Sequence, residues 1–193
     1  MIKIKNCAIY GGSFDPIHNG HIHLIKALLN SSKFEKLIVL PAGSPWQKKT
    51  HADSKMRLEM LKLALEGIDV EISECELRRS GPSYALDTVV ELRNEFPAEK
   101  FTWVLGSDAF AHIESWHKAE ELATLVDFLV VVRPGAPIKV PALKLNYEVI
   151  EVDALDVSAT EIRERIASHQ SVEEFLPDRV ARFIKMNGLY GAA

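Results

Sequence analysis

The sequence has few cysteines, with only Cys7 and Cys75 among 193 residues, and these are too few for a disulfide framework. Reducing compartments keep thiols unpaired, so this count fits a cytoplasmic protein. The sequence also lacks an apolar leader of the signal-peptide type, and no apolar run approaches the ~18 residues that a membrane helix needs. We therefore expect a cytoplasmic protein that has no membrane partner.

An excess of positive charge is also missing, because 23 Lys and Arg stand against 27 Asp and Glu, giving a net charge of −4. Nucleic-acid binding favours basic surfaces, so we expect no nucleic-acid partner. The sequence contains no P-loop, no Gly-x-Gly-x-x-Gly fingerprint, no Cys-x-x-Cys and no His-Glu-x-x-His. An anionic ligand would therefore have to be met by cations placed locally, in a site of another kind.

Short apolar segments alternate with segments of helical periodicity along the whole chain. Strands are predicted over residues 6–10, 36–41, 70–73, 101–105, 128–132 and 147–152. Helices are predicted over 22–29, 53–66 and 84–95, in a segment ending at 125, and from 158 and 177 onward. This order predicts a single α/β domain over residues 1–193, with a Rossmann-like doubly wound parallel sheet flanked by helices.

Two glycine turns follow strands that this topology places side by side. Gly11 and Gly12 follow the first strand, and Gly106-Ser107-Asp108 follows the fourth. In a doubly wound sheet the first and fourth strands are neighbours, and ligands bind at their carboxyl ends. We therefore expect the ligand site at this edge of the sheet.

The stretch from Gly11 to His21 joins the first strand to the first helix. Its glycines allow close approach of a ligand, and the N–H groups of a helix start attract phosphate. His18 and His21 are three residues apart, so both can face one ligand. The alternatives are an ordinary turn, a solvated helix face or a metal pair, and a metal would need Asp15 or His23 as a third ligand.

A second candidate phosphate element opens a helix near the C-terminus. Ser158 with Glu161 three residues later is typical of a capping box, which is a purely structural interpretation. Thr160 and Arg163 are also three apart, so a hydroxyl and a guanidinium could converge on phosphate at this helix start. In that case we expect Glu161 to point away from the phosphate, towards its cap.

Residues 12–21, Gly-Ser-Phe-Asp-Pro-Ile-His-Asn-Gly-His, resemble the signature of nucleotidyltransferases that join an adenylyl group to a phosphate monoester. Residues 158–163 resemble the Ser-x-Thr-x-Ile-Arg motif of the same superfamily. Over nearly its full length the chain is similar to the bacterial nicotinate-nucleotide adenylyltransferases, most distinctively in Ser-Tyr-x-x-Asp-Thr at 83–88. It departs from them at 46–48, Trp-Gln-Lys instead of Pro-His-Lys, and at Ala85, which is often Thr.

The resemblance implies that the protein joins ATP to nicotinate mononucleotide, giving nicotinate adenine dinucleotide and pyrophosphate in NAD biosynthesis. Nicotinamide mononucleotide or phosphopantetheine are the alternative acceptors. Mg²⁺ would be held mainly by substrate phosphates, with no protein metal site and with Asp15 as an outer-shell partner. A nucleotide sensor could lack a motif histidine or Arg163, and a metal-dependent phosphohydrolase would need a carboxylate and histidine cluster beyond Asp15. The oligomeric state stays open.

The same resemblance assigns site residues. The implied catalytic residues are His18, His21 and Arg163. ATP would be bound by Gly11, Gly12, Ser13, Phe14, His18, Gly20, His21, Gly106, Asp108, Ser158, Thr160 and Arg163. The acceptor would be bound by Ser13, Lys48 or Lys49, Tyr84, Ala85, Thr88, Trp116 and Arg133. Trp116 would stack on the pyridine ring, while the carboxylate would meet N–H groups near Tyr84 and Ala85. The histidines at 51, 112, 117 and 169 are interpreted as surface or packing residues.

Overall fold

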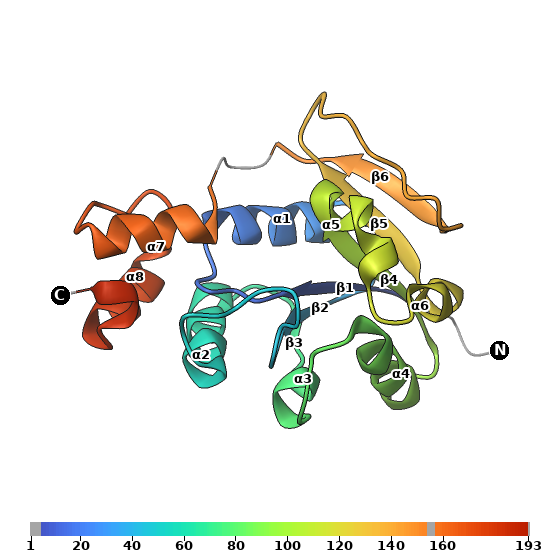
Figure 1. Ribbon diagram of the computed structural model, residues 1–193, viewed down its shortest axis with the longest axis horizontal. Helices are drawn as coiled ribbons and strands as arrows, with labels where there is room; N and C mark the ends of the chain where they lie inside the picture. Colours follow the sequence, from blue (N-terminus) through green and yellow to red (C-terminus); the bar gives the residue numbers. More distant parts are fainter. Residues whose placement is uncertain (1–4, 154–156, 193) are drawn as a thin grey trace.

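The computed structural model describes residues 5–153 and 157–192 (Figure 1). One sheet contains the strands β1 (Lys5–Gly12), β2 (Lys36–Pro41), β3 (Glu71–Ile72), β4 (Glu99–Gly106), β5 (Asp127–Val132) and β6 (Tyr147–Glu151). Their order is β3-β2-β1-β4-β5-β6, and all neighbouring pairs are parallel. The predicted fold class is confirmed, and β1 and β4 are neighbours as expected.

Helices cover both faces of the sheet, with α1 and α4 on opposite sides in Figure 1. The α-helices are α1 (Asn19–Asn30), α2 (Ser54–Leu65), α3 (Cys75–Arg78), α4 (Ala85–Glu95), α5 (Ser107–Ala111), α6 (Ala119–Leu125), α7 (Ala159–Ala167) and α8 (Asp178–Met186). Two short 3₁₀ segments are η1 (Ile113–Ser115) and η2 (Leu189–Gly191). Within 5–153 and 157–192, no helix combines the length and apolarity needed to cross a bilayer.

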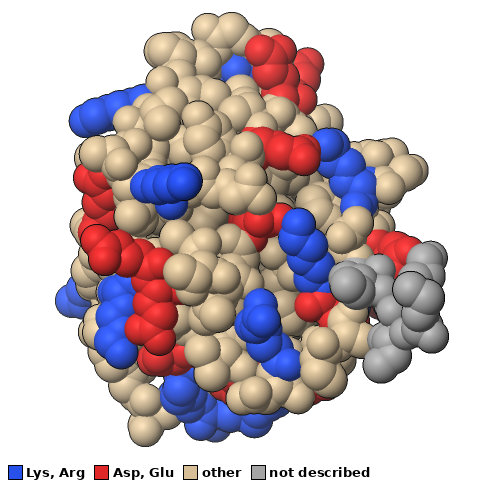
Figure 2. Space-filling view, turned by 90° about the vertical axis from the view of Figure 1, so that its right-hand side faces the viewer, with Lys and Arg blue, Asp and Glu red and all other residues tan. Residues whose placement is uncertain are grey.

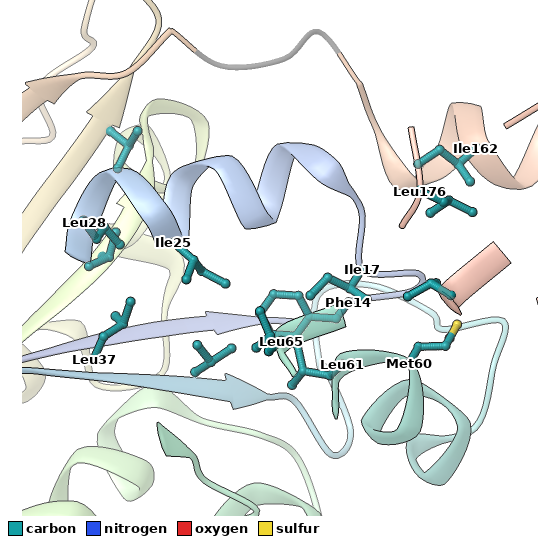
Figure 3. Packing of buried hydrophobic residues seen from close by; sticks show 14 of the residues in the cluster. Phe14, Ile17, Ile25, Leu28, Leu37, Met60, Leu61, Leu65, Ile162 and Leu176 are labelled. Atoms are coloured by element: carbon teal, nitrogen blue, oxygen red, sulfur yellow. The ribbon is translucent and has the colours of Figure 1, made fainter. Parts of the chain in front are cut away.

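Alternation along β1 divides the core between the two faces of the sheet. Ala8 lies in one buried cluster with Ile25 of α1, while Ile9 lies in the other with Val89 of α4. Successive strand residues point to opposite faces, so one apolar strand supplies both clusters. Figure 3 shows that the first cluster extends from α1 and α2 to Ile162 of α7. The C-terminal helices are therefore packed into the core that supports the β1 turn.

The structure differs from the sequence prediction at several boundaries. Helix α1 begins at Asn19 instead of residue 22, with His18 as its N-cap, and the Asn19 N–H donates to the Phe175 carbonyl at 2.8 Å. Helix α3 lies partly in a segment predicted as a polar connection, 76–82. A four-residue helix carries too little periodicity to be detected. Strand β3 contains only Glu71 and Ile72, at the end of the sheet.

The surface in Figure 2 carries both signs of charge. Lys and Arg side chains are interspersed with Asp and Glu, and they do not form an extended basic patch on this face. This mixture agrees with the nearly balanced composition. Cations that meet an anionic ligand must then be those gathered at the site itself.

Candidate active site

The turn after β1 is shaped by two glycines that make room for rings. A Cβ atom on Gly12 would lie 3.0 Å from the Phe14 ring, which is buried although Phe14 has a φ of 47°. A Cβ atom on Gly20 would lie 3.0 Å from Val157 and 3.1 Å from the His18 ring. Side-chain packing therefore gives these glycines a structural role of their own. Their role in ligand approach and the contact of Phe14 with ATP stay predictions, and the Phe14 side chain lies in the core.

The two motif histidines, which the spacing predicted to face one ligand, lie against each other. Their ring centroids are 3.6 Å apart and the ring planes differ by 27°. The His18 backbone N–H donates to Nδ1 of His21 at 3.2 Å, so a neutral His21 carries its hydrogen on Nε2. Nδ1 of His18 is buried and has no hydrogen-bond partner among the described residues.

Burial keeps both imidazoles neutral in the free protein. It lowers the pKa of His18 to about 4. It also lowers the pKa of His21 well below its usual value, and the charges of His18 and Lys48 act in the same direction. A neutral imidazole still offers one N–H donor. The pair can therefore donate hydrogen bonds to a phosphate, and protonation would have to be driven by the bound anion.

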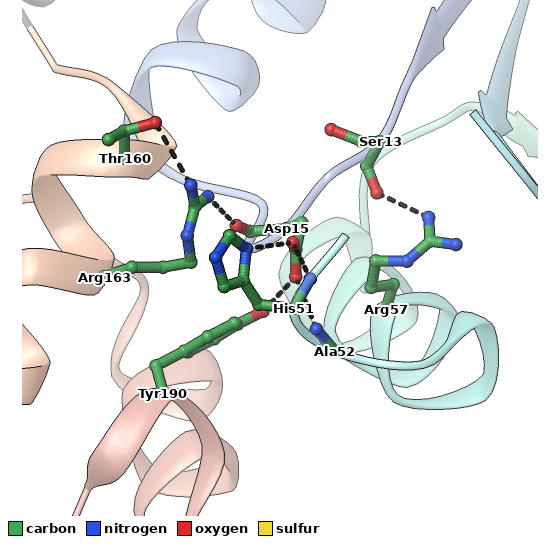
Figure 4. Close-up of polar contacts among 8 residues, drawn as sticks. All are labelled: Ser13, Asp15, His51, Ala52, Arg57, Thr160, Arg163 and Tyr190. Carbon is green, nitrogen blue, oxygen red and sulfur yellow. Dashed lines mark hydrogen bonds and ion pairs between the residues drawn. The ribbon is translucent and has the colours of Figure 1, made fainter. Parts of the chain in front are cut away.

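Arg163 of α7 connects the C-terminal motif to the β1 turn (Figure 4). Its Nη1 donates to the backbone carbonyl of Asp15 at 2.7 Å, and its Nη2 donates to Oγ1 of Thr160 at 3.1 Å. A guanidinium and a hydroxyl from one helix start thus lie next to the turn that carries the histidines. The two motifs, 148 residues apart in sequence, form one site.

The start of α7 is only partly the capping box that the sequence suggested. Oγ of Ser158 accepts a hydrogen bond from the Glu161 N–H at 3.1 Å. The Glu161 carboxylate does not return to the cap, because it accepts from Nε of Arg165 at 3.0 Å. Glu161 is therefore directed along the helix towards Arg165, and the reciprocal half of the box is absent.

Asp15 has a structural role that the sequence did not reveal. Its carboxylate accepts from the N–H groups of His51 at 2.7 Å and Ala52 at 3.0 Å, and from the Tyr190 hydroxyl at 2.7 Å (Figure 4). Burial alone would raise the pKa of Asp15, but these hydrogen bonds and the charge of Arg163 outweigh it and lower the pKa. Both oxygens accept hydrogen bonds from the protein, and the outer-shell contact of Asp15 to Mg²⁺ stays a prediction. The described residues contain no group of three His, Cys, Asp or Glu placed to hold a metal.

A cavity of about 330 Å³ opens at the carboxyl ends of β1 and β4. This size suits a small organic ligand. Four segments surround it: the β1 turn, the loop after β2, the region of α3 and α4, and the region from β4 to η1. The lining residues are Tyr10, Gly11, Gly12, Ser13, Leu40, Ala42, Pro45, Trp46, Gln47, Lys48, Glu76, Ser83, Ala85, Trp103, Val104, Leu105, Gly106, Ala109, Trp116 and His117.

Aromatic side chains form much of the cavity wall. Trp116 meets Trp103 edge to face, with 6.0 Å between ring centroids. The Tyr84 ring stacks on His117 at 4.1 Å, and Trp46 approaches Tyr84 at 6.1 Å. Such a wall presents ring faces to a flat aromatic ligand, and an electron-rich face attracts a cationic ring.

Comparisons with known proteins agree with this geometry. A family model described as cytidylyltransferase-like matches residues 9–165. The nicotinate-nucleotide adenylyltransferase of Bacillus subtilis (strain 168) is 35% identical over 190 residues, covering 97% of this chain and 99% of that protein. The chain belongs to the nicotinate-nucleotide adenylyltransferase family. The solved structures of Plasmodium falciparum nicotinic acid mononucleotide adenylyltransferase, complexed with NaAD and with APC, share its fold with TM-scores of 0.83 and 0.79, at 22% identity and 98% coverage of both chains.

The residues that family resemblance assigned to the acceptor fall into two groups. The cavity wall includes Ser13, Lys48, Ala85 and Trp116, and it includes Lys48 in preference to Lys49. Tyr84 backs the wall through its stacking on His117. The lining does not include Thr88, which is fully buried, or Arg133, which follows β5.

The residues assigned to ATP surround the same edge of the sheet. Gly11, Gly12, Ser13 and Gly106 line the cavity. Asp108 is exposed in the first turn of α5. The histidine pair and the start of α7 are not part of the cavity lining; they lie beside it, where Arg163 contacts the β1 turn.

Two buried charged residues of the site were missed by sequence reasoning. Arg57 of α2 donates from Nη1 to the Ser13 carbonyl at 2.7 Å and from Nη2 to the Gly43 carbonyl at 3.1 Å, so it joins the β1 turn to the loop after β2. Burial lowers the pKa of Arg57. The one available signal was its helical spacing with Met60 and Leu61, which share the buried face of α2.

Glu76 of α3 is the second missed residue, with 5% of its surface exposed at the cavity wall. No local motif marks it. Two histidines interpreted as surface or packing residues are exposed and also contact the site, because His117 stacks on Tyr84 at the cavity wall and the backbone of His51 binds Asp15.

Proposed function

We propose that the protein transfers the adenylyl group of ATP to nicotinate mononucleotide, forming nicotinate adenine dinucleotide and pyrophosphate, a step of NAD biosynthesis. The observation that carries the proposal is that one turn, after β1, carries the stacked histidines, is held by Arg163, and supplies Gly11, Gly12 and Ser13 to the wall of an aromatic-walled cavity. Similarity to the Bacillus subtilis enzyme over 97% of the chain supports the same activity. So does the fold shared with a Plasmodium falciparum enzyme that holds NaAD.

The reaction needs no nucleophilic side chain, because the acceptor brings its own phosphate. An oxygen of that phosphate attacks the α-phosphorus of ATP in line, and the bond from the α-phosphorus to the bridging oxygen breaks. Pyrophosphate leaves with the electron pair of that bond. Catalysis then consists of positioning the two anions and stabilising charge that develops during the transfer.

The protein supplies hydrogen-bond donors for this charge. His18 and His21 donate to phosphate oxygens, and Arg163 contributes a guanidinium from the start of α7. The ATP-binding set is that expected from the family resemblance, from Gly11 to His21, at Gly106 and Asp108, and from Ser158 to Arg163. Their place around one edge of the sheet supports this assignment.

The acceptor occupies the aromatic-walled cavity in this proposal. Lys48 meets its phosphate, Trp116 stacks on the pyridine ring, and N–H groups near Tyr84 and Ala85 receive the carboxylate. Mg²⁺ enters as part of the ATP complex, because the described side chains offer no three-ligand group for a resident ion. We retain two further predictions from the sequence, a single nucleotidyltransferase domain over residues 1–193 and a cytoplasmic location.

The experiment that tests this function is pyrophosphate release with ATP, Mg²⁺ and a panel of phosphate monoesters. The carboxylate of nicotinate can accept hydrogen bonds at both of its oxygens. The amide of nicotinamide offers one oxygen and turns its NH₂ group towards the N–H donors of the pocket, and each donor left unpaired costs ~1–3 kcal/mol. Two such mismatches predict a kcat/KM preference of roughly 10²–10⁴ for nicotinate over nicotinamide mononucleotide. Equal values for the acid and the amide, or a preference for phosphopantetheine, would contradict the proposed acceptor.

A further inference from the structure

Glu76 is a buried carboxylate in the wall of the acceptor cavity, and it is held from behind by a short polar chain. Oγ1 of Thr88 donates to Oε1 of Glu76 at 2.6 Å. Nη2 of Arg79 donates in turn to Oγ1 of Thr88 at 3.0 Å. The single hydroxyl hydrogen of Thr88 can serve only one acceptor, and the Tyr84 carbonyl lies farther away, at 3.2 Å. Thr88, which family resemblance assigned to the acceptor, is thus committed to Glu76.

The loop that carries Lys48 rests directly on Glu76. A Cβ atom on Gly43 would lie 2.2 Å from the backbone carbonyl oxygen of Glu76, closer than two such atoms can approach, so only glycine fits beside the backbone of α3. Next to this contact, the Ser44 N–H donates to Oγ of Ser83 at 3.1 Å, and the Ser83 N–H donates to the Ser44 carbonyl at 2.9 Å. The loop after β2 and the segment before α4 are therefore joined beside Glu76.

The charge of Glu76 is engaged by its own neighbours. Burial raises the pKa of its carboxyl, while hydrogen bonds from Thr88 and Ser83, the charge of Arg79 and the backbone of Gly43 act in the opposite direction. A free carboxylate here would repel an acidic acceptor. A carboxylate that is saturated by protein donors can instead fix the distance between the segments that supply them.

We propose that Glu76 is a positioning residue for the acceptor. It holds the Gly43–Lys48 loop and the Ser83–Ala85 segment at the separation that the pyridine mononucleotide requires. This inference rests on the proposed function, since it names the acceptor of that site. Because the hydrogen bonds of Glu76 run to the acceptor segments, its loss acts on acceptor binding, and ATP binding at the histidine and Arg163 side is spared.

The test compares Glu76→Gln with Glu99→Gln. Glu99 is also a largely buried carboxylate, with 11% of its side chain exposed, but it lies at the start of β4 and pairs with Lys36 at 3.6 Å. We expect Glu76→Gln to raise the KM for nicotinate mononucleotide roughly tenfold, the effect of one displaced hydrogen bond, with kcat and the KM for ATP within about twofold. Glu99→Gln should leave all three unchanged. An unchanged acceptor KM in Glu76→Gln, or an equal rise in the KM for ATP, would overturn the proposal.

A second pair of variants keeps the test valid if Glu76→Gln folds poorly. Thr88→Val removes the hydroxyl and keeps the shape, so it should reproduce the rise in acceptor KM, while Thr88→Ser should restore the parent value. Failure of Thr88→Ser to restore it would contradict the role of the hydroxyl.

Hydrogen exchange separates this inference from the proposed function, because it needs no substrate. Backbone amides of residues 43–49 and 83–88 should exchange faster in Glu76→Gln, and Glu99→Gln should leave them unchanged. If the parent protein transfers nothing to nicotinate mononucleotide, the proposed function fails, while faster exchange still supports the hold of Glu76 on both segments. Unchanged hydrogen exchange of residues 43–49 and 83–88 in Glu76→Gln would show that Glu76 does not position these segments, whatever the activity of the protein.

Discussion

His18 and His21 illustrate how burial sets the chemistry of single residues. An exposed imidazole titrates near pH ~6.5, whereas the desolvated rings of this pair favour the neutral form. The backbone hydrogen bond received by Nδ1 of His21 also opposes its protonation, because a protonated nitrogen cannot accept. The sequence could predict that the two rings lie on one side of the helix start, but it could not predict their neutrality, which depends on the surrounding core.

The lowered pKa of His18 has a consequence for stability. The unfolded chain binds a proton at His18 near pH ~6.5 and the folded protein only near pH 4, so the unfolded state binds more protons in this window. Above pH ~6.5 His18 is neutral in both states and the free energy of unfolding is highest with respect to this residue. As the pH falls towards 4, the free energy of unfolding decreases by up to roughly 1.4 kcal/mol per pH unit.

Urea unfolding at about pH 7 and about pH 5.5 measures this effect in the parent protein and in His18→Gln. We expect the free energy of unfolding to be lower at about pH 5.5 than at about pH 7 in both proteins. The decrease should be smaller in His18→Gln, because one titrating group is gone. An identical decrease in the free energy of unfolding between the two pH values in both proteins would show that His18 is not responsible.

At the scale of elements, α7 joins two parts of the chain that the sequence presents separately. Its start carries Thr160 and Arg163, and Arg163 holds the backbone of Asp15 in the β1 turn. The Asp15 carboxylate then holds the His51–Ala52 backbone and Tyr190. Helix α7 therefore supports the histidine motif as well as presenting a guanidinium to phosphate.

Arg163→Ala should lower kcat/KM for ATP, because it removes a charge-assisted donor. It should also cost about 1–2 kcal/mol of stability, since the Asp15 carbonyl loses its partner. Arg165→Ala is the matched control on the same helix, because Arg165 pairs with Glu161. It loses the ion pair with Glu161 but should keep normal kcat/KM for ATP. Equal kcat/KM for ATP in Arg163→Ala and the parent would show that the start of α7 is only a helix cap and does not bind phosphate.

The predictability of the elements followed their length. Helix α1 carries apolar residues at helical spacing and strands β2 and β5 are continuous apolar runs, so these elements were predicted within a few residues, whereas α3 has only four residues and was missed. Glu76 lies in that helix, so the missed element also concealed a buried residue of the cavity wall. Short elements are stabilised by contacts with distant segments, and local patterns do not report those contacts.

At the scale of the whole molecule, the sheet order determines where the site lies. The order β3-β2-β1-β4-β5-β6 brings the turns after β1 and β4 to one edge, as the alternation of segments predicted. Family resemblance and motif spacing predicted the histidines and Arg163 as site residues, and the structure brings Arg163 to the turn that carries the histidines. Motif spacing could not select Arg57, Glu76 or the carboxylate contacts of Asp15, since each joins segments that meet only after folding.

The central claim is that adenylyl transfer takes place at the stacked histidines of the β1 turn, and steady-state turnover of His18→Ala and His21→Ala tests it most directly. Each ring supplies a donor to developing charge, so each variant should lose roughly 10²–10³ in kcat. His23→Ala, on the exposed face of the same helix, should keep the parent kcat. Near-normal turnover in both His18→Ala and His21→Ala would contradict the account and leave the pair as a packing feature of the β1 turn.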